Sequence, residues 1–495
     1  MKPIQPARVR FAPSPTGRMH MGSARTALYN YLLAKRTGGQ FILRIEDTDF
    51  NRYVEGAEQE LRDGLHWLGL DWDEGVGVGG PYGPYHQSER KEIYLEYAQQ
   101  LIDKGFAYPC FCSKERLDLV RKEQIKRKEN THYDGTCRHL TPEEAQSKIT
   151  DGKPYVIRFK TPKEGSITVH DTLRGDITVE NKNINDYILV NSDGWALYHL
   201  AAMVDDHLMK ITHVIRGSEW LPTFPLHAHI IRAFGWQEPR WIHLSVFLKP
   251  SGKGKMSKRD AAVALDSGYS IFVTDLQKLG YVAEGVLNWL LLMGWGIAEG
   301  EFMTLDEMVQ NFDITKVNPS PAAIDFTKLD YFSGAHIRQL DQEDLAQRIK
   351  PFFVEAGYQV DDDLLLKIVP IIRERLVTLD DALTFAAFFF KDKIVVKFED
   401  LVAKNLSPQE SLDVLEKTYA VLTSLDEITL EKAEPPMRDL VEELGLKAGQ
   451  VFGILRNAVT GQQISPPLFE SMEIIGREKV LQRVEDAISI LKSQI

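Results

Sequence analysis

No stretch of this sequence is apolar for long enough to cross a membrane. A membrane-spanning helix needs roughly 20 apolar residues, and no apolar run in the 495 residues approaches that length. The first residues, MKPIQPARVRF, also lack the apolar segment of a secretory signal. We therefore expect a cytoplasmic protein without membrane contact. The alternative is an organellar protein whose transit peptide has been removed.

Positive charge is scarce for a protein that binds nucleic acid. The formal net charge is −12, and residues 331–495 carry 19 Lys and Arg against 28 Asp and Glu. Any contact with RNA must therefore use local basic patches. One such patch, LVRKEQIKRK at 119–128, has five basic residues, Lys126 and Arg127 among them, and one acid. A solvated helix face is the simpler interpretation of a charge run.

Cysteine is also scarce, and its placement is informative. The three cysteines form Cys110-x-Cys112 and, twenty-four residues later, Cys137-x-His139. Structural Zn²⁺ takes four sulfur or nitrogen ligands, and three cysteines with one histidine are an ordinary set. The charged loop between the two pairs cannot bury a core of its own, so a metal would stabilise it. The motif predicts one zinc ion per chain, and the alternative is free thiols beside an unrelated histidine.

The first fifty residues predict the start of a nucleotide-binding domain within a chain long enough for three or more domains. ARVRFAP (7–13) is typical of a strand, SARTALYNYLLAKR (23–36) of a helix and QFILRIED (40–47) of a second strand. This βαβ unit predicts a parallel sheet. Ligands of such sheets bind at the carboxyl ends of the strands, where the Pro- and Gly-rich loop 13–22 lies.

The rest of the chain divides into an insertion, a second half and a helical region. ILVNSD (188–193) and residues 211–216 predict two further strands, with a helix between them. Residues 91–195 carry their own helices and strands, which indicates an insertion. From about residue 335 the pattern is helical, because Leu412, Leu415, Tyr419 and Leu422 repeat at helical spacing, as do Leu481, Val484, Ile488 and Leu491.

Two short motifs suit the binding of a nucleotide. His20, Gly22 and Ser23 open a helix directly after the first strand, and helix N-termini bind phosphate through free N–H groups and a partial positive charge. GKGKMSKRD (252–260) places Lys255 and Lys258 in a Gly-rich loop that could close over a triphosphate. Alone, each motif is better explained as an ordinary helix start or a solvated basic loop.

Together the two motifs resemble the signature pair of class I aminoacyl-tRNA synthetases. Further segments resemble the bacterial type of glutamyl-tRNA synthetase: RFAPSPTG (10–17), RIEDTD (44–49), DEGVGVGGPYGPYHQSER (73–90), LYHLAAMVDDHLM (197–209), HVIRGSEW (213–220) and KMSKRD. The resemblance covers at least residues 7–335. The C-terminal region separates this chain from the glutaminyl relatives, because they end in β-barrels whereas this chain ends in helices. Short paralogues that glutamylate a modified base lack the C-terminal region altogether.

The resemblance implies a site for glutamate and a site for ATP. Arginine binds carboxylates in bidentate fashion, and Arg10 and Arg216 correspond to the family's ligands of substrate glutamate. The family's glutamate site also includes Ala12, Ser14, Glu46 and Tyr198, with Glu46 at the substrate ammonium group. The resemblance assigns ATP binding to His20, Gly22, Ser23, Lys255, Ser257, Lys258 and Arg259. His20, Gly22, Lys255 and Lys258 are the expected catalytic residues. Some family members have Asn where this chain has Ala202. As an alternative to binding glutamate, Arg216 could pair with Asp205 or Asp206.

The implied reaction and partners follow from the same resemblance. We expect ATP, Mg²⁺ and Zn²⁺, activation of L-glutamate and its transfer to tRNA(Glu) by a monomeric enzyme. Some glutamyl enzymes carry the same cysteine and histidine set and others lack it. Lys126 and Arg127 lie inside the zinc loop, which favours RNA contact. Arg375 corresponds in some members to an arginine that favours the glutamate anticodon, and a surface arginine is the alternative.

The expected fold is α/β, a Rossmann-like doubly wound catalytic domain with an inserted acceptor-end domain, followed by an all-α anticodon-binding region. We expect catalytic halves at 1–90 and 196–250, the insert at 91–195, a stem-contact domain at 251–334 and two helical bundles at 335–495. Rival functions are an enzyme that also charges tRNA(Gln), an inactive RNA-binding homologue and a small-molecule adenylyltransferase. The last would have no use for 160 helical residues after residue 335.

Overall fold

The computed structural model describes residues 5–256, 268–296 and 301–495 of the chain. These residues form two compact units. The first comprises residues 1–276 and 286–326, and the second comprises residues 277–285 and 327–495. The chain passes between the units within helices α9 (Val273–Lys278), α10 (Ala283–Leu292) and α12 (Phe326–Gln339). No helix among the described residues is long and apolar enough to span a bilayer.

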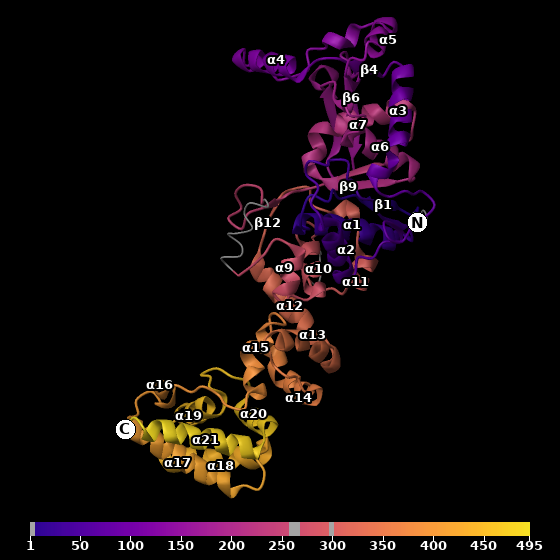
Figure 1. Ribbon diagram of the computed structural model, residues 1–495. Helices are drawn as coiled ribbons and strands as arrows, with labels where there is room; N and C mark the ends of the chain where they lie inside the picture. Colours follow the sequence, from indigo (N-terminus) through magenta and orange to yellow (C-terminus); the bar gives the residue numbers. More distant parts are fainter. Residues whose placement is uncertain (1–4, 257–267, 297–300) are drawn as a thin grey trace. The chain divides into compact units, whose positions relative to one another are not determined.

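The first unit is built on two groups of parallel strands that meet at β1 and β9. The first group has the order β1 (Arg8–Phe11), β2 (Gln40–Leu43) and β3 (Glu74–Gly75), all parallel. The second places β9 (His213–Gly217) beside β10 (Arg240–Leu244), again parallel. Thr212 N–H donates to the Arg8 carbonyl at 2.9 Å, so β9 lies next to β1 (Figure 1).

The strand order therefore reverses between β1 and β9. The chain first moves outward from β1 to β3, and it later returns to the other side of β1 with β9 and β10. This reversal defines the doubly wound fold and places its ligand crevice at the carboxyl ends of β1 and β9. The predicted α/β fold is confirmed.

Helix α1 (Met21–Thr37) carries the chain from β1 to β2. It begins at the His20 cap and ends at Gly38, whose φ of 66° is a left-handed conformation that glycine adopts without strain. Its buried residues include Ala24, Ala27 and Leu28. Strands β1 and β2 are buried at every residue after the first, as expected of strands inside a parallel sheet.

The segment between the two catalytic halves has a sheet of its own. Strands β4 (Ala107–Cys110), β5 (Val156–Phe159) and β8 (Ile188–Val190) are antiparallel. The hairpin β6 (Ser166–Asp171) and β7 (Gly175–Glu180) behaves differently, because β6 pairs in parallel with β10. Part of the predicted insert thus extends the catalytic sheet. The short pair β11 (Phe247–Leu248) and β12 (Ala322–Ala323) completes the described strands.

The remaining helices of the first unit surround these sheets. They are α2 (Ala57–Trp67), α3 (Lys91–Asp103), α4 (Lys114–Lys126), α5 (Pro142–Thr150), α6 (Tyr198–Leu208), α7 (Phe224–Phe234) and α11 (Leu305–Asn311).

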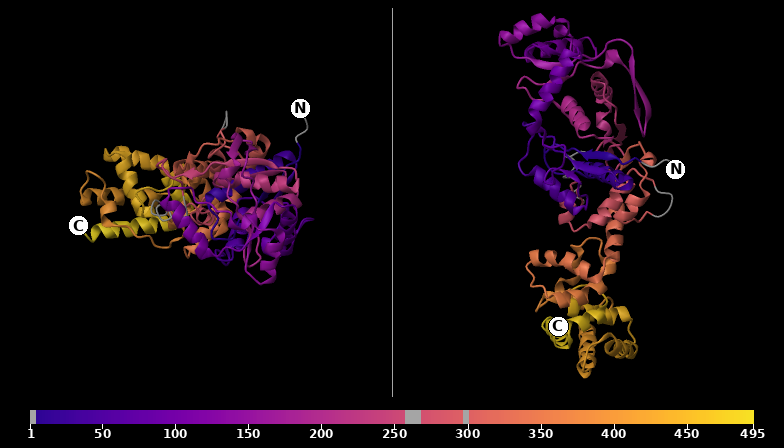
Figure 2. Two further views of the ribbon diagram at one scale, coloured as in Figure 1. Left: turned by 90° about the horizontal axis from the view of Figure 1, so that it is seen from above. Right: turned by 90° about the vertical axis from the view of Figure 1, so that its right-hand side faces the viewer.

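The second unit is helical throughout its described residues, drawn in orange to yellow in Figure 2. Its helices are α12 (Phe326–Gln339), α13 (Gln342–Glu355), α14 (Asp362–Ile372), α15 (Asp381–Ala386), α16 (Phe398–Leu401), α17 (Pro408–Ser424), α18 (Leu430–Leu444), α19 (Ala448–Thr460), α20 (Leu468–Ile475) and α21 (Arg477–Lys492). They enclose two apolar clusters, one around α13 to α15 and one around α16 to α21. The predicted helical C-terminal region is confirmed.

Candidate active site

A cavity of about 1300 Å³ opens where the strand order reverses. The ends of β1 and β9, the loop before α1 and the start of α6 contribute its walls. Ten residues predicted from the sequence line it: Arg10, Ala12, Ser14, His20, Gly22, Ser23, Glu46, Tyr198, Arg216 and Lys255. The predicted Ser257, Lys258 and Arg259 lie outside the described residues.

The N-terminus of α1 forms one wall of the cavity. His20 Nδ1 accepts a hydrogen bond from the Gly22 N–H at 3.0 Å and so caps the helix. A Cβ added to Gly22 would meet no protein atom closer than 3.4 Å, the distance to His20 Nδ1. Protein packing therefore does not require glycine here, and the missing side chain leaves space on the cavity side. A capped helix start with this space suits a nucleotide phosphate.

Arg10 lines the cavity, but its guanidinium already holds a carboxylate. Its Nε donates to Asp206 Oδ1 at 3.0 Å and its Nη2 to Asp206 Oδ2 at 3.3 Å. Asp206 also accepts from Arg44 at 2.8 Å. Burial opposes the charge of Asp206, yet Arg10 and Arg44 hold the pKa of this carboxyl below its usual value. Much of the Arg10 charge is thus neutralised within the protein.

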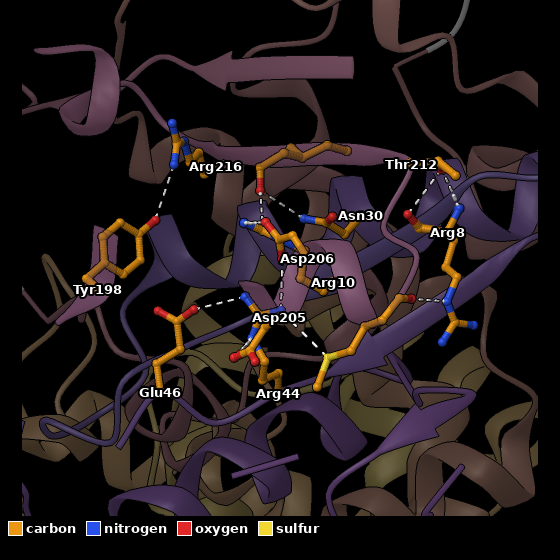
Figure 3. Close-up of polar contacts among 12 residues, drawn as sticks. Arg8, Arg10, Asn30, Arg44, Glu46, Tyr198, Asp205, Asp206, Thr212 and Arg216 are labelled. Carbon is orange, nitrogen blue, oxygen red and sulfur yellow. Dashed lines mark hydrogen bonds and ion pairs between the residues drawn. The ribbon is translucent and has the colours of Figure 1, made fainter. Parts of the chain in front are cut away.

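Arg10 and Asp206 belong to a buried ionic network in which Arg44 is the central residue (Figure 3). Arg44 is fully buried and donates to Glu46 Oε1 at 3.0 Å. Asp205, also fully buried, accepts from Arg90 Nε at 2.7 Å. Burial raises the pKa of Glu46, although Arg44 and Arg10 oppose the shift. Three cations balance three anions in the network: Arg10, Arg44 and Arg90 with Glu46, Asp205 and Asp206.

Arg216 at the end of β9 does not belong to this charge-balanced network. Its hydrogen-bond partners are His243, His227 and the Tyr198 hydroxyl, all of which can be neutral. Among the residues that the structure describes, no carboxylate oxygen lies within 4.0 Å of an Arg216 nitrogen. The pairing with Asp205 or Asp206 that the sequence left open is therefore absent. Arg216 is 5% exposed and lines the cavity, so it offers a bound anion a positive charge that no ion pair among the described residues neutralises.

A second candidate site lies in the antiparallel sheet of the insert. The ligand atoms of Cys110, Cys112 and Cys137 all lie within 4.8 Å of one another, and the Cys112 and Cys137 sulfurs are 3.6 Å apart. Two sulfur ligands of one tetrahedral zinc are separated by about 3.8 Å. The Tyr133 hydroxyl lies 3.3 Å from the Cys110 sulfur and 3.5 Å from that of Cys112. His139, predicted as the fourth ligand, is exposed and is not part of this group.

The predicted RNA contacts are all exposed. Helix α4 has no buried residue, and Lys126 and Arg127 follow one another at its end. Arg127 Nε lies 3.4 Å from a Glu129 carboxylate. In the second unit Arg375 is exposed, and burial together with the Arg375 charge lowers the pKa of Arg456. Arg375 and Arg456 thus form a local pair of positive charges in an acidic region.

Several residues of these sites were not found from the sequence. His227 and His243 contact Arg216 from 11 and 27 residues away, and Tyr133 approaches Cys110 from 23 residues away. None belongs to a short motif. A search for polar residues in otherwise apolar strands would have pointed to His243, because β10 is buried on both sides of it.

The chain matches families and proteins of one kind over nearly its whole length. Residues 6–331 match the family described as "tRNA synthetases class I (E and Q), catalytic domain", and residues 344–488 match an "Anticodon binding domain". The Glutamate--tRNA ligase of Dehalococcoides mccartyi is 42% identical over 98% of both chains. That of Treponema denticola is 41% identical over 97% of this chain and 99% of the relative.

A solved structure agrees with these sequence matches. The crystal structure of a glutamate tRNA ligase from Elizabethkingia meningosepticum, in complex with its amino acid, is 36% identical, with a TM-score of 0.89. The match covers 98% of this chain and all of the other. Together with the doubly wound catalytic fold and the helical second unit, these matches show that the chain belongs to the glutamate–tRNA ligases, a family of class I aminoacyl-tRNA synthetases.

Proposed function

We propose that this enzyme activates L-glutamate with ATP and transfers it to the terminal adenosine of tRNA(Glu). The observation that carries the proposal is the composition of the cavity. It joins a capped helix N-terminus, a buried carboxylate and a buried arginine whose charge no acidic residue described in the structure neutralises. A nucleotide phosphate, an ammonium group and a carboxylate match these three features in turn.

Glutamate binds in the part of the cavity between β1 and β9. Arg216 takes the carboxylate of the glutamate side chain, because its own partners are neutral. Glu46 holds the ammonium group, while Arg10 contributes less because Asp206 already occupies its fork. Tyr198 supports Arg216 through its hydroxyl, and Ser14 and Ala12 line the same cavity.

The chemistry consists of two displacements. An oxygen of the substrate α-carboxylate attacks the α-phosphorus of ATP, and the bond to pyrophosphate breaks. The 2′-hydroxyl of the terminal adenosine then attacks the mixed anhydride carbonyl; AMP leaves and the hydroxyl proton passes to solvent. No protein side chain becomes covalent, so His20, Gly22, Ser23 and Lys255 act by positioning and by electrostatic stabilisation. Ser257, Lys258 and Arg259 join them, and Mg²⁺, when bound, neutralises phosphate charge.

The insert and the second unit would contact tRNA. Lys126 and Arg127 are exposed on a helix with no buried residue, which leaves their charges available to phosphate. Arg375 would contact the anticodon, supported by its neighbour Arg456. The predicted five-part division at 1–90, 91–195, 196–250, 251–334 and 335–495 remains part of this proposal, as do a monomeric state and a cytoplasmic location.

The cysteine group would hold one structural Zn²⁺. Three sulfurs near tetrahedral spacing support this assignment. The fourth ligand predicted from the sequence is His139, but the separations favour the Tyr133 oxygen. An oxygen and a sulfur bound to one tetrahedral zinc are about 3.5 Å apart, close to the 3.3 and 3.5 Å found here.

Glutamate-dependent exchange of pyrophosphate into ATP, with and without tRNA, tests the proposal. Transfer of glutamate to purified tRNA(Glu) and tRNA(Gln) completes the test. We expect exchange with glutamate and charging of tRNA(Glu). A protein that binds tRNA but catalyses neither step would contradict the proposal, and equal charging of both tRNAs would identify the broader enzyme considered as the alternative.

A further inference from the structure

Three neutral groups hold the guanidinium of Arg216 in place. Arg216 Nε donates to His243 Nε2 at 3.0 Å and Nη2 donates to His227 Nδ1 at 3.0 Å. Nη1 donates to the Tyr198 hydroxyl at 3.3 Å. His227 and His243 are fully buried. One N–H bond on each of Arg216 Nη1 and Nη2 remains for a ligand.

The chemistry of arginine fixes the tautomer of both histidines. Arginine can only donate, so His243 Nε2 and His227 Nδ1 must both be unprotonated acceptors. His243 Nδ1 then carries its proton toward Asp171 Oδ2, 2.8 Å away. His227 Nε2 carries its proton toward His199 Nδ1, 2.9 Å away. A second proton on either ring would point a donor at Arg216.

Asp171 and the sheet register anchor this arrangement. Asp171 Oδ2 also accepts from the His243 backbone N–H at 3.0 Å, while Oδ1 accepts from Leu173 and Arg174 N–H groups, both at 3.0 Å. His243 and Arg216 are directly paired residues of the parallel strands β10 and β9. The ring is therefore fixed both by its own backbone and by a fully buried carboxylate.

We propose that His227 and His243 are positioning residues that orient Arg216 and keep its charge available, and that they thereby set the preference for a side-chain carboxylate over an amide. The contrast with Arg10 supports the proposal, because Asp206 occupies that fork and shares its charge. An acidic partner at Arg216 would hold the guanidinium equally well but would cancel the charge that distinguishes glutamate from glutamine.

The surroundings keep both rings neutral. Burial, followed by the charge of Arg216, lowers the pKa of His227 well below its ordinary value, and His199, His243 and Arg10 act in the same direction. Burial lowers the pKa of His243 to about 4; Asp171 opposes the shift, while Arg216 and Arg174 favour it. At neutral pH both rings can therefore accept from Arg216.

The test, which rests on the proposed function, compares variants that keep or remove each acceptor. In His227→Asn and His243→Gln, an amide oxygen can replace the nitrogen that faces Arg216. In His227→Leu and His243→Leu no acceptor remains. A misplacement of a binding group by about 1 Å costs roughly 100-fold in rate, so we expect the leucine variants to lower kcat/KM for glutamate by up to about 100-fold, with a higher KM for glutamate. The KM for ATP should change little, and the amide variants should recover most of the loss.

His227→Asp addresses specificity directly. It places a carboxylate beside Arg216, so the ratio of kcat/KM for glutamate over glutamine should fall. His229 provides matched controls, because it lies on the same helix but pairs with Asn181 rather than Arg216. His229→Leu and His229→Asn should leave the KM for glutamate unchanged.

The outcomes separate this inference from the proposed function. A wild-type protein that does not charge tRNA with glutamate would refute the function itself. With that activity present, folded leucine variants that keep a normal KM for glutamate would overturn the positioning role. So would an equal rise in the KM values for glutamate and ATP, or an unchanged preference in His227→Asp. Melting temperatures with and without ATP identify variants that fail to fold, and the amide variants then decide the question.

Discussion

His139 and Tyr133 are the two candidates for the fourth ligand of the proposed zinc at the cysteine group. His139 completes the sequence motif, yet it is exposed, whereas the Tyr133 oxygen lies within 3.5 Å of two cysteine sulfurs. The Tyr133 hydroxyl also accepts from the Cys137 N–H at 2.8 Å. This hydrogen bond holds Tyr133 beside the cysteine group.

Zinc content should distinguish the two residues. We expect about one zinc per chain in the wild type, its loss in Cys112→Ser and weaker retention in Tyr133→Phe. His139→Ala should retain zinc at the wild-type level. Elemental analysis after dialysis against a series of chelator concentrations measures each case. Loss of zinc from His139→Ala but not from Tyr133→Phe would restore the histidine as the ligand.

At the scale of residues, the sequence predicted which side chains face the cavity better than it predicted their partners. Arg10 and Arg216 both line the cavity as expected. Nothing local in the sequence distinguishes them, because their partners come from elements far along the chain: Asp206 lies 196 residues from Arg10, and His243 lies 27 residues from Arg216. Charge compensation depends on packing, which a short motif does not encode.

At the scale of elements, the N-terminus of α1 joins local helix chemistry to ligand binding. Gly22→Ala should fold, since its Cβ would meet only the His20 and Phe247 rings, at 3.4 Å or more, and alanine favours the helix. The added methyl group should enter the space proposed for the nucleotide. We expect the KM for ATP to rise at least tenfold, while the melting temperature stays within a few degrees of the wild type.

Arg36→Ala is the control, because it changes an exposed residue of the same helix that is not among the residues lining the cavity. It should affect the KM for ATP much less. If Gly22→Ala bound ATP normally, the nucleotide would have to lie elsewhere in the cavity.

The buried histidines around β9 and β10 should make the first unit sensitive to acid. Burial lowers the folded-state pKa of His243 to about 4, whereas the unfolded value is about 6.5. Between these values the unfolded chain binds more protons, so the free energy of unfolding falls as the pH drops from about 6.5 towards 4. The contribution of this one histidine is about 1.4 kcal/mol per pH unit within that window.

Urea unfolding followed by tryptophan fluorescence measures this effect, because all eight tryptophans belong to the first unit. His243→Gln should show a shallower loss of stability between pH 6.5 and 5 than the wild type. His170→Gln, which replaces an exposed ring, is the control. Identical pH dependence in the wild type and His243→Gln would mean that this ring does not titrate as described.

The elements themselves were largely predictable, whereas their neighbours in the sheet were not. The predicted strand at 7–13, helix at 23–36 and strand at 40–47 correspond to β1, α1 and β2. Apolar periodicity within each segment was sufficient for this. The pairing of β6 with β10 joins residues about 70 positions apart, and periodicity carries no information about such a partner. The sequence therefore placed the whole of 91–195 in an insert, although its hairpin β6–β7 extends the catalytic sheet.

At the scale of the whole molecule, an enzyme of net charge −12 must hold a polyanion. The long-range field opposes this, so binding should depend on a small number of local contacts. Helix α4 is one candidate because Lys126 and Arg127 at its end are exposed and the helix buries none of its side chains. The second unit offers another in Arg375, which lies near Arg456.

These two regions should respond differently to substitution. Lys126→Glu with Arg127→Glu removes counterion-releasing contacts, and each lost phosphate contact lowers the log–log salt slope by about 0.7–0.9. The KM for tRNA should therefore rise and its salt dependence should flatten, while the KM for ATP stays constant. Lys153→Glu with Lys182→Glu changes the net charge equally at exposed positions outside α4 and controls for the overall field.

Arg375→Ala should instead narrow the preference for tRNA(Glu) over tRNA(Gln), because an anticodon contact acts on one tRNA more than on the other. Steady-state charging of both tRNAs at several salt concentrations measures all three variants. If Arg375→Ala weakened both tRNAs alike, the anticodon assignment of Arg375 would be wrong; if the control pair matched the α4 pair, net charge rather than α4 would govern binding.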